Sequence, residues 1–509
     1  MPTASSRFFM TLKINKIQTH AFNNPAVTIS WIVVMLAVII SAVQFFYNRS
    51  LWLDEARLAL NIINKSHFEL LLPLDMNQVA PLLYLQIVKL FSALTPEAEY
   101  GLRLFSLLCF WAALVLFYKT ARLLLKDTLP FVFVVSLFAL NSSMVYYSSE
   151  VKQYMTDVFI AVLFVFLLLR DYKSPGTKHL SILVAGIVAI WVSNVAPIIL
   201  CASGVGLLQQ AAIKQKKDLW QLVGVGGVWL IVFVVYYVLF LYDHPTRAFM
   251  QAYWSEAHAF LPLNPFSSDF WVFLLYRLGG LSKMSFSPFI ALAVFFSLFV
   301  LAGYVHLLKN KKTFTFILLA LPIVTHMLLS AIALYPFMGR LILYLAPYVI
   351  LASGFGLQAV VDRWPLKAKS LRAVFVLVPG LFLALIMYSF PLHRSEIKQP
   401  LEFIQDNRQQ GDKLYVAPGS VAAYTYYTQT GHFCENNMVV ILSRPRMTSK
   451  EAFFEQTILP LTGPCWLLFS HNQEIADYVV GKLGKMSLKP AKAFETVNAA
   501  TYLFYFNSE

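Results

Sequence analysis

Long runs of apolar residues, separated by short polar stretches, make up most of the first 391 residues of the chain. The runs are continuous rather than alternating, which favours helices over the strands of a membrane barrel. Most approach the roughly 20 residues that a helix needs to cross a bilayer, where backbone groups must bond to one another. We therefore predict eleven transmembrane helices, at residues 26–47, 101–118, 129–147, 155–169, 180–193, 195–210, 219–241, 285–308, 313–334, 340–360 and 372–391.

The loop after the first span carries an apolar segment of its own. The span at 26–47 is longer than the core of a signal peptide, which has about 7 to 15 residues, so we expect it to be retained. The loop at 48–100 is long for a plain connection. Its segment 78–94 is apolar but contains Lys89 and a proline near its start. We expect this segment to be a helix that lies at the interface or re-enters the membrane.

The last part of the chain, residues 392–509, is mixed, charged and rich in turn residues. Short apolar runs bounded by turn residues predict strands at 412–417, 437–442 and 465–471. A helix is predicted at 474–484, ending at Gly484. We therefore predict an all-α transmembrane domain at 1–391 and a small α/β domain at 392–509.

Composition and charge orient these two domains. The chain is 58% hydrophobic and 13% charged, with a formal net charge of +14 and a mean hydropathy of +0.64. If the N-terminus is cytoplasmic, the inner stretches hold 19 basic and four acidic residues, as the positive-inside rule requires. An odd number of spans then places the tail outside. Nucleic-acid binding is not indicated, because the basic residues are dispersed over short loops.

Two cysteines, Cys434 and Cys465, lie outside the predicted spans. In an oxidising outer compartment they can form a disulfide bond. Spacing alone fixes no disulfide geometry, so a bridge and two unpaired thiols both stay open.

An acidic pair follows the first span. The sequence WLDEARLA places Asp54 and Glu55 just ahead of Arg57, and the same loop adds Asp75 and Gln78. In the predicted topology all of them face outward. Acidic residues also keep a plain loop soluble, and spacing alone favours that simpler interpretation.

Three further polar features are predicted at the same outer level. Glu150, Lys152 and Tyr154 cluster where the third span turns back, and in a helix Glu150 and Tyr154 would share one face. Arg340 begins a span in YPFMGRLILYLAP, and Arg103 begins another in EYGLRLFSLL. Each alone is typical of an interfacial anchor. Together they bring acidic and basic groups within reach of a lipid headgroup.

The spans carry charged residues only near their ends. An ion-coupled carrier is expected to hold ionisable groups at mid-membrane. The chain also has no GxGxxG or Walker pattern for a nucleotide and no cysteine or histidine spacing typical of zinc. The pattern favours chemistry at the membrane surface over transport.

Five segments of the chain occur in a recognisable order: WLDEARLA, NQVAPLLYLQIVKLF, EYGLRLFSLL, SSEVKQYMTD and YPFMGRLILYLAP. In this order they resemble the membrane glycosyltransferases of the GT-C fold, and most of all the bacterial family 39-like branch. That branch is related to the protein O-mannosyltransferases and to the aminoarabinose transferase that modifies lipid A. The tail segment LEFIQDNRQQGDKLYV is similar to the start of the outer domain in the same branch.

The resemblance implies a polyprenyl-phosphate sugar donor whose headgroup lies at the outer leaflet. It also implies that an acidic residue of the first outer loop acts as the base or orients the acceptor, a role that falls to Asp54 with Glu55 beside it. Arg57 matches a position near the donor phosphate in the aminoarabinose transferase. That enzyme has a lysine where this chain has Gln78, so Lys152 or Arg340 is a candidate replacement.

We therefore expect an inverting hexosyl- or pentosyltransferase of the bacterial inner membrane, acting at its outer face on a lipid, glycan or protein hydroxyl. Whether Asp54 and Glu55 share a Mg²⁺ or Mn²⁺ ion stays open. The alternatives are a transporter or lipid-linked sugar flippase, and a scaffold that presents the tail. The candidate catalytic residues are Asp54 and Glu55, and the candidate substrate-binding residues are Arg57, Asp75, Gln78, Arg103, Glu150, Lys152, Tyr154 and Arg340.

Overall fold

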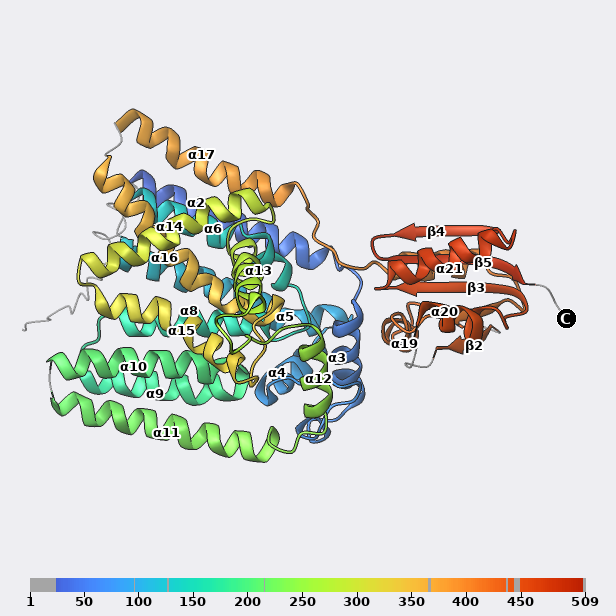
Figure 1. Cartoon of the computed structure of the whole chain (residues 1–509), viewed down its shortest axis with the longest axis horizontal. Coiled ribbons are helices and arrows are strands. Elements are labelled where there is room, and N and C mark those ends of the chain that lie inside the picture. The colour runs from blue at the N-terminus through green and yellow to red at the C-terminus, as the bar shows by residue number, and fades with distance from the viewer. Residues whose placement is uncertain are drawn as a thin grey trace, which may run out of the picture.

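The computed structural model describes residues 24–95, 97–125, 128–214, 216–364, 368–435, 438–443 and 449–506. Within these ranges a bundle of helices adjoins a smaller domain built on a β-sheet (Figure 1). Some residues of the predicted inner stretches lie outside the described residues, namely Arg7, Lys13, Lys16, Lys126, Asp127 and Lys367, as does Asn437 of the predicted strand at 437–442.

Helical structure covers every one of the eleven predicted spans. Among the described residues, seven helices are long and apolar enough to cross a membrane. Nine spans correspond to single helices: α2 (Pro25–Phe46), α5 (Ala98–Leu125), α8 (Tyr154–Leu169), α9 (Pro175–Val192), α10 (Ala196–Lys214), α11 (Lys216–Phe240), α14 (Ile290–Lys309), α15 (Thr313–Ala331) and α17 (Ala368–Met387).

The two other spans are interrupted. The third consists of α6 (Leu129–Ala139) and α7 (Ser142–Tyr147), and the tenth begins as the 3₁₀ segment η2 (Gly339–Leu345) and continues as α16 (Ala346–Arg363). The break in the third span has a local cause. The side chain of Asn141 accepts hydrogen bonds from the backbone N–H groups of Ser143 and Met144, and so caps a new helix.

Helix α14 crosses α16 at very close range. Gly303 lies against the backbone carbonyl of Ala352, and Gly356 lies against that of Phe299. A Cβ at either glycine would clash with backbone atoms, which cannot turn aside as a side chain can. These two glycines therefore allow the two helices to pack with their backbones in contact.

The first loop folds at one end of the bundle (Figure 1). It contains α3 (Leu53–Asn64), the short η1 (Glu69–Leu71) and α4 (Leu82–Ser92), which begins directly after Pro81. The predicted helix within 78–94 is therefore present, and its interfacial position stays a prediction. A second long connection contributes α12 (Arg247–Glu256) and α13 (Ser268–Ser285).

The tail forms a five-stranded sheet in the order β2-β1-β3-β5-β4. The predicted strands are β1 (Lys413–Val416), β2 (Val439–Leu442) and β3 (Gly463–Ser470), which pair in parallel, and the predicted helix is α21 (Gln473–Lys485). The sequence prediction missed the antiparallel β4 (Lys492–Thr496) and β5 (Ala499–Phe506). The remaining elements of the tail are α18 (Lys398–Asn407), α19 (Val421–Gln429), α20 (Lys450–Phe453) and the π-helical η3 (Phe454–Ile458).

The tail is fixed to the first loop and to the start of α5. The hydroxyl of Tyr427 donates to Glu99 at 2.7 Å and accepts from the backbone N–H of Leu51 at 2.7 Å. Lys398 forms an ion pair with Glu99 at 2.7 Å. The tail and the first loop therefore lie at the same end of the bundle (Figure 1).

Cys434 and Cys465 are both free. Cys465 is buried on β3, whereas Cys434 is exposed after α19. Of the two states that the sequence left open, the structure has the unpaired one.

Candidate active site

Asp54 lies in the first turn of α3, where a carboxylate is favourably placed toward the positive end of the helix dipole. Its Oδ2 forms an ion pair with Arg340 of η2. The Nε of Arg340 also donates to the hydroxyl of Tyr154 at 2.7 Å. The side chains of Asp54 and Arg340 are each 18% exposed to solvent, so both are accessible to a substrate.

Positive charge surrounds Asp54 on several sides. Burial by itself would raise the pKa of this carboxyl, but Lys152, Arg340, Arg57 and Arg394 outweigh burial and lower the pKa. Asp54 is therefore held in its ionised form. The guanidinium of Arg57 makes no hydrogen bond or ion pair with any described residue, although its backbone carbonyl accepts from Asn61, so the guanidinium is available to a ligand.

Lys152 and Gln78 are joined by a hydrogen bond. The Nζ of Lys152 donates to the Oε1 of Gln78 at 2.6 Å, and both residues are buried. Burial lowers the pKa of Lys152 despite the attraction of Asp54. The glutamine at the position of the expected lysine thus holds another lysine, which comes from the turn between α7 and α8 and lies near Asp54.

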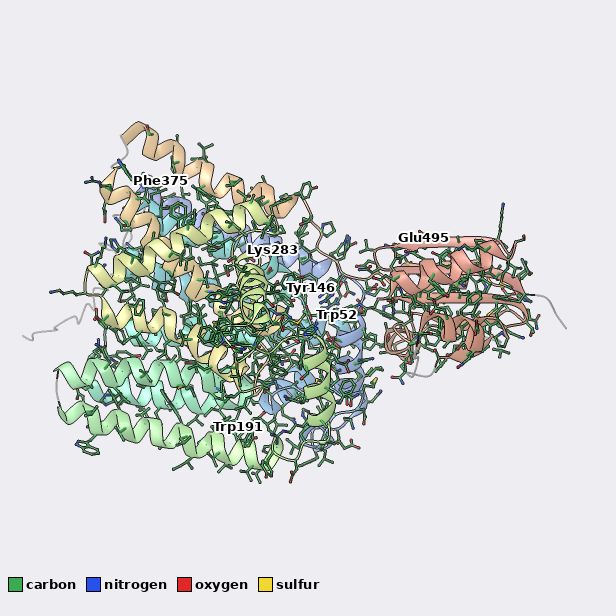
Figure 2. The ribbon with its side chains drawn as sticks, in the orientation of Figure 1. Trp52, Tyr146, Trp191, Lys283, Phe375 and Glu495 are labelled. Atoms are coloured by element: carbon green, nitrogen blue, oxygen red, sulfur yellow. The ribbon has the colours of Figure 1, made fainter. Side chains whose placement is uncertain are left out.

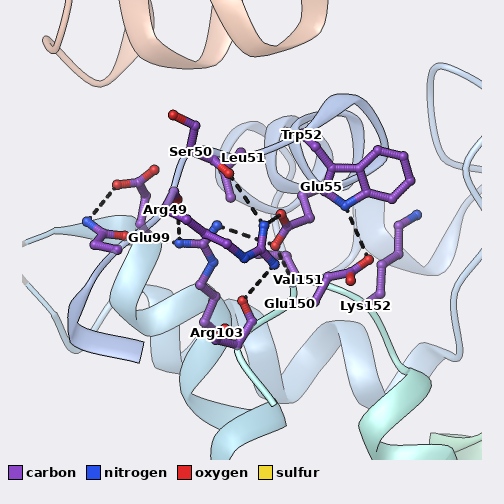
Figure 3. Close-up of polar contacts among 12 residues, drawn as sticks. Arg49, Ser50, Leu51, Trp52, Glu55, Glu99, Arg103, Glu150, Val151 and Lys152 are labelled. Atoms are coloured by element: carbon purple, nitrogen blue, oxygen red, sulfur yellow. Dashed lines mark hydrogen bonds and ion pairs between the residues drawn. The ribbon is translucent and has the colours of Figure 1, made fainter. Parts of the chain in front are cut away.

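Glu55 is fully buried and lies between Arg49 and Arg103 (Figure 3). Its Oε2 pairs with Arg49 at 2.6 Å, and its Oε1 lies 3.4 Å from Arg103 and accepts from the backbone N–H of Val151 at 2.9 Å. Burial raises the pKa of Glu55, but Arg49 and Arg103 reverse this effect and lower it. Arg103 also donates to the side chain of Asn48 and to the carbonyl of Arg49. Through Glu55, Arg103 and Val151, the cluster joins α3, α5 and the turn after α7.

Glu150 is buried beside Trp52 (Figure 3). The indole N–H of Trp52 donates to Oε1 of Glu150 at 3.3 Å, while Oε2 has no partner among the described residues. Burial, with a contribution from the Glu55 carboxylate, raises the pKa of Glu150 to about 7. The predicted shared helix face of Glu150 and Tyr154 is wrong, because α7 ends at Tyr147 and Glu150 lies in the turn before α8.

Trp52 connects this cluster with the tail (Figure 2). The guanidinium of Arg394 lies 3.8 Å above the Trp52 ring, and that of Arg340 lies 4.9 Å from the same ring. The imidazole of His471, from the tail, lies 5.2 Å away. The sequence prediction missed Trp52, Arg394 and His471, because the sequence alone does not show that the tail folds back onto the first loop.

Asp75 takes part in a different contact. Its carboxylate is 70% exposed and pairs with Lys65 at 3.0 Å, while its backbone bonds to the side chain of Asn61. The structure therefore brings Asp54, Lys152, Tyr154 and Arg340 together, and it directs the side chain of Asp75 toward Lys65.

The acidic pair does not fit a shared divalent cation. Both oxygens of Glu55 bind protein donors, and Oδ2 of Asp54 binds Arg340. Among the described residues no three His, Cys, Asp or Glu side chains gather as metal ligands would. A Mg²⁺ or Mn²⁺ ion at Asp54 would also meet the surrounding guanidinium groups.

A cavity of about 450 Å³ lies between the helix ends next to this cluster. Its lining includes Tyr146 and Tyr147 of α7, Tyr388 just after α17, and Leu392 and His393 of the connection to the tail. The ring of Tyr147 lies 5.6 Å from that of Tyr154, the hydrogen-bond partner of Arg340. The cavity thus offers space beside the charged residues.

No protein-family model and no curated protein matches this sequence. Among solved structures, the chain is similar to ArnT from Cupriavidus metallidurans bound to undecaprenyl phosphate, with a TM-score of 0.53 and 12% identity over 93% of this chain and 97% of that chain. The apo state of ArnT from the same organism gives a TM-score of 0.47, at 12% identity over 92% of this chain and 97% of that chain. The likeness to the first structure, together with the apolar helices, shows that the chain is a multi-pass membrane protein with the GT-C fold, as its sequence predicted.

Proposed function

We propose that this chain is a glycosyltransferase that moves a sugar from a polyprenyl-phosphate donor to an acceptor hydroxyl. The observation that carries the proposal is the accessible, ionised Asp54 within a group of cations that exceeds its charge. An excess of cations suits a phosphate, and an ionised carboxylate suits a hydroxyl. The similar ArnT structure, which holds undecaprenyl phosphate, supports this class of donor.

In this proposal Asp54 accepts the proton of the acceptor hydroxyl. The hydroxyl oxygen attacks the anomeric carbon as the bond from that carbon to the phosphate oxygen breaks. Attack from the side opposite the phosphate inverts the anomeric centre. The released polyprenyl phosphate carries the bonding electron pair, and the proton on Asp54 passes to water.

Arg57, Lys152 and Arg340 stabilise the charge that develops on the departing phosphate. Lys152 is oriented for this by its hydrogen bond to Gln78. Arg340 has an additional effect, because it is paired with Asp54 before a donor binds. A phosphate competes for this guanidinium, and weakening the ion pair makes Asp54 a stronger base.

Glu55 and Arg103 have a structural part in the proposal. Their groups are buried and bonded to one another and to Arg49, so they hold α3 in place rather than meet a substrate. Glu150 and Tyr154 accept hydrogen bonds from Trp52 and Arg340, respectively, and so orient these two side chains. No catalytic step is assigned to a metal ion.

The site is proposed to face the exterior of a bacterial inner membrane. The predicted excess of basic residues at the opposite ends of the spans supports this orientation. The sugar is a hexose or a pentose, and the acceptor is a lipid, a glycan or a protein.

Replacement of Asp54 tests the proposed base. We expect Asp54→Asn to lower the transfer rate at least 100-fold, because general-base catalysis contributes about 10² to 10⁴. The measurement supplies undecaprenyl-phosphate-linked sugars one at a time with an envelope extract, and follows release of undecaprenyl phosphate by mass spectrometry.

The matched control is Asp477→Asn, which changes an exposed acid on α21 and should keep the wild-type rate. If the folded Asp54→Asn protein transfers sugar as fast as the wild type, Asp54 is not the base.

A further inference from the structure

We propose that Arg394, in the segment between α17 and α18 at the start of the tail, binds the phosphate group of the lipid-linked donor. The inference rests on the proposed function and adds a binding residue that comes from outside the transmembrane domain. Arg394 lies outside the five segments whose order carries the resemblance to glycosyltransferases, and ahead of the tail segment LEFIQDNRQQGDKLYV.

The guanidinium of Arg394 is oriented but has no acidic partner in the part of the chain that the structure describes. It stacks 3.8 Å above the ring of Trp52, and its side chain makes no hydrogen bond or ion pair with a described residue. Stacking on an aromatic face leaves the N–H groups at the edge of the guanidinium free to donate. A planar group held in this way is suited to donate two parallel hydrogen bonds to phosphate oxygens.

The backbone around Arg394 is held from both sides. Gln44 of α2 donates to the carbonyl of Leu392 at 2.6 Å and accepts from its N–H at 2.8 Å. On the other side, Asn498 of the tail donates to the carbonyl of Arg394 at 2.8 Å, and Ser395 bonds to Ser470 at 2.8 Å. The arginine is therefore presented from a fixed segment.

The electrostatic surroundings of Arg394 favour an anion. Arg394 lies close enough to Asp54 to help lower the pKa of that carboxyl, although Asp54 is already paired with Arg340. The cluster thus holds more positive than negative charge, and Arg394 contributes to the excess. A phosphate bound between Arg394 and Arg340, which share the Trp52 ring, would balance it.

Space for the ligand adjoins this residue. The two residues before Arg394, Leu392 and His393, line the cavity of about 450 Å³. Tyr147 lines the same cavity and lies within electrostatic reach of Arg394. The phosphate group of a donor can therefore reach Arg394 from the cavity while the segment between α17 and α18 stays folded.

Binding of undecaprenyl phosphate to the purified full chain in detergent tests the inference. We expect Arg394→Gln to weaken binding about tenfold or more, since hydrogen bonds to charged groups are among the stronger ones. Arg394→Lys, which keeps the charge but loses the planar group, should restore part of the affinity. Arg408→Gln is the matched control, because Arg408 binds carbonyl groups of Cys434 and Glu435 within the tail and should leave the affinity unchanged.

Inorganic phosphate serves as a second probe. If Arg394→Gln weakens the binding of both inorganic phosphate and undecaprenyl phosphate, the result supports a site for the phosphate group itself. If it weakens the binding of undecaprenyl phosphate alone, the result supports a site that also needs the isoprenyl chain. If Arg394→Gln, with an unchanged melting temperature, binds undecaprenyl phosphate as tightly as the wild type, the inference is wrong. If the wild-type chain itself does not bind undecaprenyl phosphate, it is the proposed function that fails.

Discussion

Asp54 and Glu55 are adjacent in the sequence, yet they have different surroundings. Asp54 is partly exposed and pairs with Arg340, whereas Glu55 is buried between Arg49 and Arg103. An acidic pair can be recognised from the sequence, but its two members cannot be told apart there. The difference depends on Arg103 and Arg340, which the fold brings to α3 from distant helices.

Ionisation of the Glu150 carboxyl lowers the stability of the folded protein. In the unfolded chain its carboxyl ionises near the ordinary pKa of 4.5, while in the folded protein burial raises the pKa to about 7. Between these values the folded state binds more protons, so stability is highest below the lower pKa and falls as pH rises toward 7.

We therefore expect Glu150→Gln to remove part of this pH dependence. The glutamine carbonyl can still accept from the Trp52 N–H, but the side chain cannot ionise. The measurement is the melting temperature in detergent between about pH 5 and 7.5, where the wild type should lose more stability than the variant. Glu402→Gln, at an exposed position on α18, should follow the wild type. Equal pH dependence of Glu150→Gln and the wild type would contradict this account of Glu150.

At the scale of elements, the hydrophobic pattern was sufficient to locate the helices of the predicted spans, but it did not predict α3, α12, α13, α18 or α19. It did not reveal the break between α6 and α7, because the capping bonds of Asn141 interrupt a run that is otherwise apolar. It also missed β4, where KAFET is short and half polar, as suits a strand at the edge of a sheet. Segments whose structure depends on a cap or on a neighbouring strand are thus the ones that periodicity overlooks.

The contact between α14 and α16 makes a prediction about packing. We expect Gly356→Ala to destabilise the protein by about 1–3 kcal/mol, because the added methyl group meets the backbone of Phe299. Gly380→Ala is the matched control, since nothing lies within 4 Å of a Cβ at that position on α17. Thermal unfolding in detergent compares the two. If Gly356→Ala and Gly380→Ala melt at the same temperature, α14 and α16 can move apart to accept the methyl group without loss of stability.

At the scale of the whole molecule, the GT-C fold was predictable from motifs in a consistent order, even though the similar solved structure is only 12% identical. The contribution of the tail was not predictable. Leu392 and its partner Gln44 are 348 residues apart, and Tyr427 lies 328 residues from Glu99. These contacts place Arg394 over Trp52, and no local pattern in the sequence indicates them.

The central proposal is sugar transfer at this site, and transport of the lipid-linked sugar is its rival. The most direct measurement reconstitutes the wild-type chain in liposomes that contain labelled undecaprenyl-phosphate sugars and an envelope extract. We expect the label to become covalently bound to a new acceptor, with one undecaprenyl phosphate released for each sugar transferred. Movement of the intact lipid-linked sugar across the bilayer, without a new glycosylated product, would contradict the proposal.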